Sequence, residues 1–136
     1  MNNEPKWTVV TGGNRGLGLE TCRQLARLGH HVVLAARDAT QAHQAAASLA
    51  NAGTVRAAQL DVSNDASVQA FAARAKNELG PLHALVNNAG ISMNGFDADV
   101  VRGTLSVNFF GALRVTRALA PLVADGGNIV MVSSGM

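Results

Sequence analysis

Short runs of apolar and β-branched residues alternate with longer segments whose apolar residues recur at helical spacing. The short runs cover residues 7–11, 31–36, 55–60, 82–87 and 128–133. The longer segments cover residues 16–28, 40–51, 65–79 and 104–124. Uninterrupted apolar strands suit a sheet buried on both faces, and their alternation with helices predicts βαβ units. We therefore expect an α/β fold, a doubly wound parallel sheet forming a single domain over residues 1–136.

Residues typical of helix ends stand where this pattern needs them. Gly29, Gly53 and Gly80 follow the first three helical segments, where a glycine releases a helix toward the next strand. Pro121 is expected to end or kink the last segment. Short polar residues that can cap a helix precede the second and third segments: Asp38 or Thr40, and Ser63 or Asn64.

Composition narrows the class of protein. The net charge is +2 without a run of like charges, so no nucleic-acid surface is expected. No apolar stretch approaches the roughly 18 residues of a membrane helix, and the chain begins without a secretion signal. Cys22, the single cysteine, cannot form an intrachain disulfide and is expected to pack as a small apolar group. A lone cysteine is typical of a reducing compartment, so we expect a cytoplasmic protein. We expect no metal site, because the histidines and the cysteine are not spaced as metal ligands.

The first strand runs into a glycine-rich loop that leads directly into a helix. Its sequence is Thr-Gly-Gly-Asn-Arg-Gly-Leu-Gly. Gly12 permits a sharp exit from the strand, Gly16 lets the backbone approach a pyrophosphate, and Gly18 lets the helix pack closely. The unpaired N–H groups of the helix start would face the anion. Such a loop can also be an ordinary tight turn, but its place between strand and helix favours a phosphate-bearing cofactor.

The order of the motifs resembles the short-chain dehydrogenase/reductase family. The loop has the form Thr-Gly-x-x-x-Gly-x-Gly, and further family motifs follow in order: Asp61-Val62, Asn87-Asn88-Ala89-Gly90, Asn108 and Ser133-Ser134. The resemblance covers essentially the whole chain, and Asn14-Arg15 with Ala36-Arg37 is similar to the carbonyl-reductase-like members. It implies a Rossmann fold and an oxidoreductase that transfers a hydride between a nicotinamide cofactor and a small carbonyl or alcohol substrate.

The residues after the second strand bear on the choice of cofactor. An NAD-type site would place a carboxylate at the strand end, where this chain has Ala36. Arg37 can instead pair with a 2′-phosphate, and Arg15 can approach the same group from the glycine loop. These residues favour NADP(H) over NAD(H). Alternatively, Arg37 is a solvated residue beside Asp38, whose carboxylate can itself accept from the ribose.

The resemblance implies further cofactor contacts. Asp61 would accept a hydrogen bond from the adenine amino group, and its alternative role is to support Ser63 at a helix start. The side chain of Asn87 would tie neighbouring strand ends together. The full set of candidate cofactor-binding residues is Gly12, Asn14, Arg15, Gly16, Leu17, Gly18, Arg37, Asp61, Val62, Asn88, Ala89 and Gly90.

The candidate catalytic residues are Asn108 and Ser134. Apolar neighbours of Asn108 predict a buried amide that must find partners, and the resemblance implies that it interrupts the helix and holds a water for proton relay. Ser134, with Ser133 as the alternative, would bind the substrate oxygen. The family's proton donor is a tyrosine followed four residues later by a lysine, on the helix after the fifth strand. These 136 residues contain no tyrosine, so we expect a chain that is truncated relative to the family and inactive alone.

The end of the chain is expected to expose apolar surface. In the family's strand order, 3-2-1-4-5-6-7, the fifth strand is interior, whereas here it would be an edge. The 104–124 segment is apolar nearly all round. We therefore expect self-association or a homo-oligomer. Two alternatives to a reductase stay open: a non-catalytic dinucleotide-binding protein, and a protein that pairs with a partner chain, which would then supply the missing tyrosine and lysine.

Overall fold

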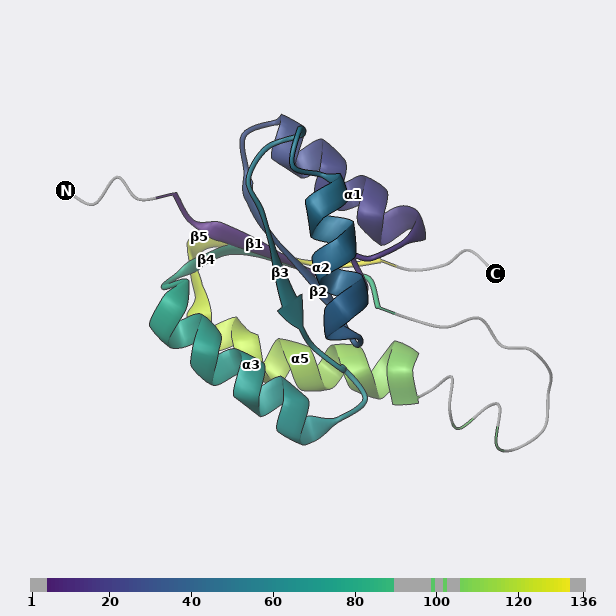
Figure 1. The fold of residues 1–136 in the computed structure, drawn as a ribbon. Coiled ribbons are helices and arrows are strands. Elements are labelled where there is room, and N and C mark those ends of the chain that lie inside the picture. Colours follow the sequence, from purple (N-terminus) through teal and green to yellow (C-terminus); the bar gives the residue numbers. More distant parts are fainter. Residues whose placement is uncertain (1–4, 90–98, 100–101, 103–105, 133–136) are drawn as a thin grey trace.

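The computed structural model describes residues 5–89, 99, 102 and 106–132. They form a five-stranded parallel sheet in the order β3-β2-β1-β4-β5 (Figure 1). The strands are β1 (Trp7–Thr11), β2 (His31–Ala36), β3 (Val55–Gln59), β4 (Leu82–Asn87) and β5 (Val123–Met131). The helices are α1 (Gly16–Arg27), α2 (Ala39–Ser48), α3 (Asp65–Glu78), the π-helical η1 (Ser106–Gly111), α5 (Ala112–Leu119) and the 3₁₀ turn η2 (Ala120–Leu122). The predicted doubly wound parallel sheet is confirmed, with α1 and α2 on one face and α3 and α5 on the other.

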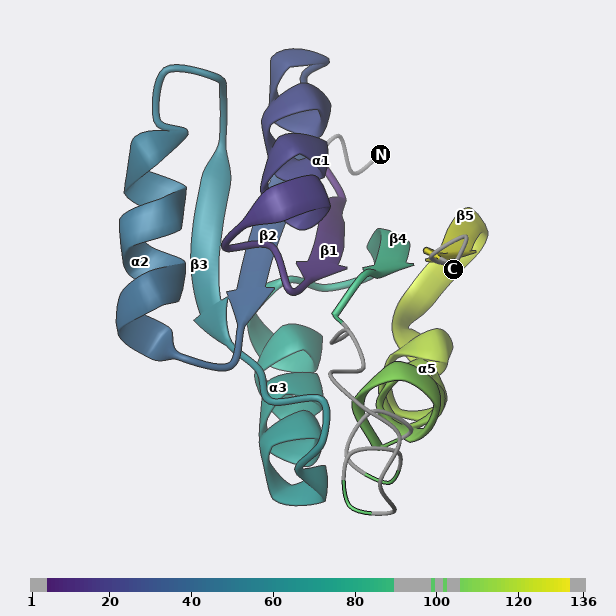
Figure 2. The ribbon, with the colours of Figure 1, turned by 90° about the vertical axis from the view of Figure 1, so that its right-hand side faces the viewer.

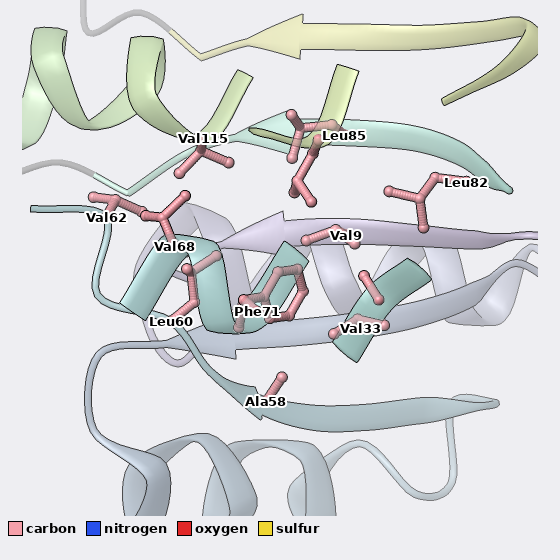
Figure 3. Packing of buried hydrophobic residues seen from close by; sticks show 13 residues of the cluster. Val9, Val33, Ala58, Leu60, Val62, Val68, Phe71, Leu82, Leu85 and Val115 are labelled. Atoms are coloured by element: carbon pink, nitrogen blue, oxygen red, sulfur yellow. The ribbon is translucent and has the colours of Figure 1, made fainter. Parts of the chain in front are cut away.

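One apolar layer lies between the sheet and helices α3 and α5. Val9 and Leu85 project from β1 and β4 toward Phe71 of α3 and Val115 of α5 (Figure 3). Val9, Leu85 and Val115 have no exposed surface. Because successive side chains of a strand point to opposite faces, the neighbours of Val9 along β1 serve the other layer.

The second layer lies beneath α1 and α2. Val10 of β1 and Leu34 of β2 pack there with Cys22 of α1 and Ala42 of α2, and none of the four has exposed surface. Burial raises the pKa of the Cys22 thiol to about 12. Cys22 is therefore a protonated, small apolar group in the core, as the sequence predicts.

The ends of the first helices follow the sequence prediction closely. The α2 helix is capped by Asp38, whose Oδ1 accepts from the backbone N–H of Gln41 at 3.0 Å. The α3 helix is capped by Asn64, whose Oδ1 accepts from the N–H of Ser67 at 2.9 Å. Gly29 and Gly80 directly follow the C-cap residues of α1 and α3 and have positive φ, as predicted. Gly53 also has positive φ, but it lies four residues beyond Leu49, the C-cap of α2, so that helix ends earlier than predicted and without this glycine.

The 104–124 segment differs from the single long helix that its periodicity predicts. The described part is a π-helical turn, the helix α5 and a 3₁₀ turn that contains Pro121. Proline has no N–H to donate and thus ends the regular helix, as expected. Strand β5 then begins at Val123 rather than at residue 128, because an irregularity in its pairing with β4 accommodates extra residues. Residues 123 and 124 therefore belong to a strand, which corrects the predicted helix end.

Strand β5 lies at one edge of the sheet beside α5 (Figure 2). Its apolar residues Ile129, Val130 and Met131 are 40%, 44% and 57% exposed. Phe109 and Phe110 of η1 are also exposed. The predicted apolar edge is therefore confirmed. Within the part of the chain that the structure describes, no helix is long and apolar enough to cross a bilayer.

Candidate functional site

The predicted cofactor-binding segments converge at the carboxyl ends of the strands. The glycine loop follows β1, Arg37 follows β2, Asp61 lies beyond β3, and Asn88 follows β4. The strand order reverses between β1 and β4, since β2 and β3 lie on one side of that pair and β5 on the other. In open α/β sheets, ligands bind in the crevice at such a switch point.

The loops after β1 and β4 are joined by side-chain hydrogen bonds at this switch point. The Thr11 hydroxyl accepts from the backbone N–H groups of Asn88 and Ala89, each at 3.0 Å, and donates to the Val86 carbonyl at 3.5 Å. The Asn88 amide donates to the Gly12 carbonyl at 3.1 Å. Sequence reasoning did not single out Thr11, although it is the first residue of the glycine motif and is almost fully buried.

Two glycines let the backbone segments of this junction come into close contact. Gly12 has φ of +62°, and a Cβ there would lie 2.8 Å from the Cα of Ala89. A Cβ on Gly18 would lie 2.2 Å from the Gly12 carbonyl oxygen and 2.4 Å from the Asn88 amide nitrogen. Gly18 thus allows α1 to approach the glycine loop itself, rather than only the strand that precedes it.

The amino end of α1 is open and lacks a side-chain cap. Its N-cap residue is Arg15, whose side chain makes no capping hydrogen bond, and its first turn contains no acidic residue. Gly16 has φ of +58°, and a Cβ there would find no heavy atom of the described residues within 4 Å. Leu17 beside it is 62% exposed. A helix start with free N–H groups and no competing carboxylate fits an anionic group such as a pyrophosphate.

The segment after β2 presents an exposed cation beside a carboxylate that already has a partner. Arg37 is exposed, and neither it nor Arg15 makes a salt bridge within the described ranges. Asp38 is engaged in capping α2 through the N–H of Gln41. The Gln41 side chain in turn accepts from the Asn14 amide at 3.1 Å, which connects the glycine loop to α2. The carboxyl ends of β1 and β2 are therefore followed by two guanidinium groups, Arg15 and Arg37, that no described carboxylate pairs with and that suit added negative charge.

The turn after β3 is held from two helices. The Asp61 Oδ1 accepts from the N–H and the hydroxyl of Ser63, at 3.0 and 2.7 Å, so the alternative role foreseen for Asp61 is present. Its backbone N–H donates to Ser67 Oγ at 2.9 Å. Val62 is buried, and its carbonyl accepts from the guanidinium of Arg114 on α5 at 2.6 Å. No sequence signal pointed to Arg114, because its contact joins α5 to the turn between β3 and α3 and depends on how α5 packs there.

Asn87 joins β4 to its neighbours, as its motif implies. It is 5% exposed, and its amide nitrogen donates to Thr116 Oγ1 at 3.1 Å and contacts the Met131 sulfur at 3.3 Å. Thr116 belongs to α5 and Met131 to β5, so one side chain links three elements. Its Oδ1 has no hydrogen-bond partner among the described residues.

The candidate catalytic residues are only partly covered by the described residues. Asn108 lies in the π-helical turn η1, where the predicted helix interruption occurs. Its side chain is exposed, which corrects the expectation of a buried amide. The exposed neighbours Phe109 and Phe110 give the reason, because this turn lies where the described chain provides no covering layer. Ser134, its alternative Ser133, and Gly90 lie outside the described residues.

Comparisons with known proteins agree with this architecture. Residues 6–136 match the family profile described as short chain dehydrogenase. Human carbonyl reductase (NADPH) 1 is 41% identical over 137 residues, which cover 94% of this chain and 48% of the relative. A metagenomic short-chain oxidoreductase solved in complex with NADP superposes with a TM-score of 0.87 and 31% identity, covering 96% of this chain and 63% of that one.

A second solved structure shows that the neighbours do not all carry the same cofactor. A short-chain dehydrogenase/reductase from Burkholderia phymatum, solved in complex with NAD, has a TM-score of 0.85 and 33% identity, covering 96% of this chain and 50% of that one. The chain spans about half the length of the curated relatives that it matches.

Proposed function

The chain belongs to the short-chain dehydrogenase family, and from this membership we propose that it is the NADP(H)-binding portion of an oxidoreductase. The proposed reaction is hydride transfer between the nicotinamide and a small carbonyl or alcohol substrate; when bound, the cofactor supplies or takes the hydride. The observation that carries the proposal is the open, uncapped start of α1. It is supported by Arg15 and Arg37, which make no salt bridge with any described residue. Residues 1–136 would act together as one binding unit.

We assign the binding roles by position along the crevice. The backbone from Asn14 to Gly18, including the exposed Leu17, would hold the pyrophosphate. Asp61 and Val62 would contact the adenine. The Oδ2 of Asp61 accepts no hydrogen bond from a described residue, whereas Oδ1 accepts two, so Oδ2 is suited to accept from the adenine amino group. Asn88, Ala89 and Gly90 would line the ribose next to the nicotinamide. Thr11 would act indirectly, by holding the Asn88 and Ala89 backbone in place.

Three features support NADP(H) over NAD(H). Position 36, where an NAD-type site would place a carboxylate, is alanine. Asp38, the next carboxylate, caps α2 through its Oδ1, which leaves only its Oδ2 for a ribose hydroxyl. Arg37 and Arg15 are free to pair with a 2′-phosphate. The human carbonyl reductase is an NADPH enzyme by name and the metagenomic oxidoreductase was solved with NADP, which supports the same choice. The Burkholderia relative was solved with NAD, so the two cofactors are to be compared directly.

Titration with the two reduced cofactors tests this assignment. We expect Arg37→Ala to weaken NADPH binding by about 10- to 100-fold, the worth of a charge-assisted pair, and to change NADH binding by less than about twofold. Calorimetry or NADPH fluorescence gives both dissociation constants. Arg117→Ala, an exposed arginine on α5, is the matched control and should change neither. Equal weakening of both cofactors by Arg37→Ala would remove the phosphate assignment, and no binding of either by the unmutated chain would overturn the proposed function.

For catalysis, we propose that Ser134 donates a hydrogen bond to the substrate oxygen and that Asn108 holds a water for proton delivery. The oxygen that receives the hydride also needs a proton donor, and these 136 residues contain no tyrosine to act as the family's acid. The chain alone should therefore bind cofactor without turnover. Carbonyl-dependent oxidation of NADPH by the purified chain would show that this account is wrong.

The exposed apolar residues of β5 and η1 favour a second candidate, a protein that pairs with a copy of itself or with a partner chain. In that case the partner, or the homo-oligomer, would complete the substrate pocket. We also propose a cytoplasmic location, because the single cysteine, Cys22, cannot form an intrachain disulfide. The test is to mix the chain with a candidate partner and measure NADPH oxidation. Oxidation by the mixture supports a reductase completed by a partner, and its absence supports a binding protein without catalysis.

A further inference from the structure

A bridge of two side chains connects the segments that follow β2 and β3. We propose that Gln59 and Ser67 are positioning residues, which fix the spacing between the 2′-phosphate site at Arg37 and the adenine site at Asp61. They would thereby raise the preference for NADP(H) over NAD(H). This inference rests on the proposed function, and it assigns a positioning role to two residues that are not among the proposed cofactor contacts.

The hydrogen bonds of the bridge form one continuous chain. The Gln59 amide nitrogen donates to the Arg37 carbonyl at 3.1 Å. The Gln59 amide oxygen accepts from the Ser67 hydroxyl at 3.3 Å. The same hydroxyl oxygen accepts from the backbone N–H of Asp61 at 2.9 Å. Each donor has one acceptor, so all three bonds are compatible with a single arrangement of protons.

The bridge begins where the backbone ladder stops. Ala36 and Gln59 are the last paired residues of β2 and β3, and the Leu60 N–H still donates to the Ala36 carbonyl at 2.8 Å. The next carbonyl, that of Arg37, receives the Gln59 side chain instead of a backbone N–H. Gln59 therefore extends the order of the sheet by one residue, to the residue whose side chain would meet the phosphate.

Ser67 anchors the other end of the bridge. It lies in the first turn of α3, and its own N–H is fixed by the capping Asn64 at 2.9 Å. Its position is therefore set by the helix start and not by the mobile end of a long side chain. A preorganised contact binds a ligand more tightly than a contact that must be ordered on binding. Loss of the Gln59 bond should free the Arg37 peptide and weaken the contacts of Arg37 more than those of Asp61, whose backbone N–H is held by Ser67 and not by Gln59.

The experiment compares cofactor preference rather than affinity alone. Gln59→Met keeps the length of the side chain and removes both of its hydrogen bonds. We expect NADPH binding to weaken by about three- to tenfold, the range for one lost neutral hydrogen bond, with NADH binding within about twofold of the unmutated chain. Gln69→Met is the matched control, because Gln69 is an exposed glutamine on α3. It should leave both dissociation constants unchanged.

A second variant tests whether the two residues act as one unit. Ser67→Ala should lower the preference for NADPH in the same direction, and the Gln59→Met/Ser67→Ala double variant should lose little more than the stronger single variant. If the variants act only by lowering stability, thermal unfolding would show that loss and the binding of both cofactors would weaken equally. Equal weakening of both cofactors would overturn the inference. An unchanged NADPH/NADH ratio in Gln59→Met would overturn it too. The proposed function fails separately, if the unmutated chain binds neither cofactor.

Discussion

The two ends of the sheet differ in how completely this chain covers them. Strands β1 and β2 are buried almost along their whole length, between α1 and α2 on one face and α3 on the other. Strand β5 is exposed over most of its length, although its residues 129–131 are apolar. The comparison teaches that the described helices, α5 included, cover the strands proposed to bind cofactor on both faces, whereas they leave most of β5 exposed.

The glycine loop belongs to the covered end, and breaking its close packing should have the largest effect. We expect Gly18→Ala to lower the free energy of unfolding by about 3 kcal/mol or more, because the new methyl group would meet backbone, which cannot move aside cheaply. Urea denaturation measures the change. Binding of NADPH should be lost as well.

Gly16→Ala is the matched comparison within the same loop. A methyl group at Gly16 would meet no described atom, so only the positive φ opposes the substitution. The expected cost is about 1 kcal/mol, the strain of a left-handed residue with a side chain. Equal losses for the two variants would mean that close packing at Gly18 does not hold the loop against α1.

Added charge on β5 tests the uncovered end. We expect Val130→Lys to weaken self-association of the chain by about tenfold or more, because an inserted lysine opposes edge-to-edge and face-to-face pairing of apolar strands. Sedimentation over a range of concentrations measures this. The free energy of unfolding should change by only about 0.5 kcal/mol, since the residue is exposed.

Asn128→Lys is the control for charge alone. Asn128 is exposed on the same strand, so this substitution adds the same charge and removes no apolar side chain. It should weaken self-association less than Val130→Lys does. An unmutated chain that is monomeric and monodisperse at high concentration would contradict the prediction from the start.

The smallest of the main effects, a change in unfolding free energy, is expected at the start of α3, a helix that covers the buried strands. Asn64→Ala removes the cap of that helix and should cost about 1 kcal/mol of unfolding free energy. Ala66→Ser, an exposed polar substitution in the same turn, is the control and should cost about 0.5 kcal/mol or less. A cost for Asn64→Ala no greater than for the control would show that the cap contributes little at this end of the sheet.

The sequence predicted the covered end of the sheet better than the uncovered one. The observed bounds of β1, β2 and β4 are those predicted from their apolar runs, because these runs are short and are interrupted by polar residues, glycine or proline on both sides. Around η1 and β5 the bounds predicted from the apolar pattern were wrong in part. The apolar pattern of residues 104–124 fits a helix, but Pro121 and the irregular pairing of β5 with β4 divide it into several short elements.

The sequence by itself determined the glycine loop, the strand order that follows from its family motifs, and the charges available at the cofactor edge. Only the tertiary structure decided which polar groups are already engaged. Asp38 caps a helix, Gln59 supports the Arg37 carbonyl from 22 residues away, and Arg114 holds Val62 across 52 residues. The reason is physical: a residue type fixes what a side chain can donate or accept, whereas its partner is fixed by which distant segments the packed helices and sheet bring within about 3 Å.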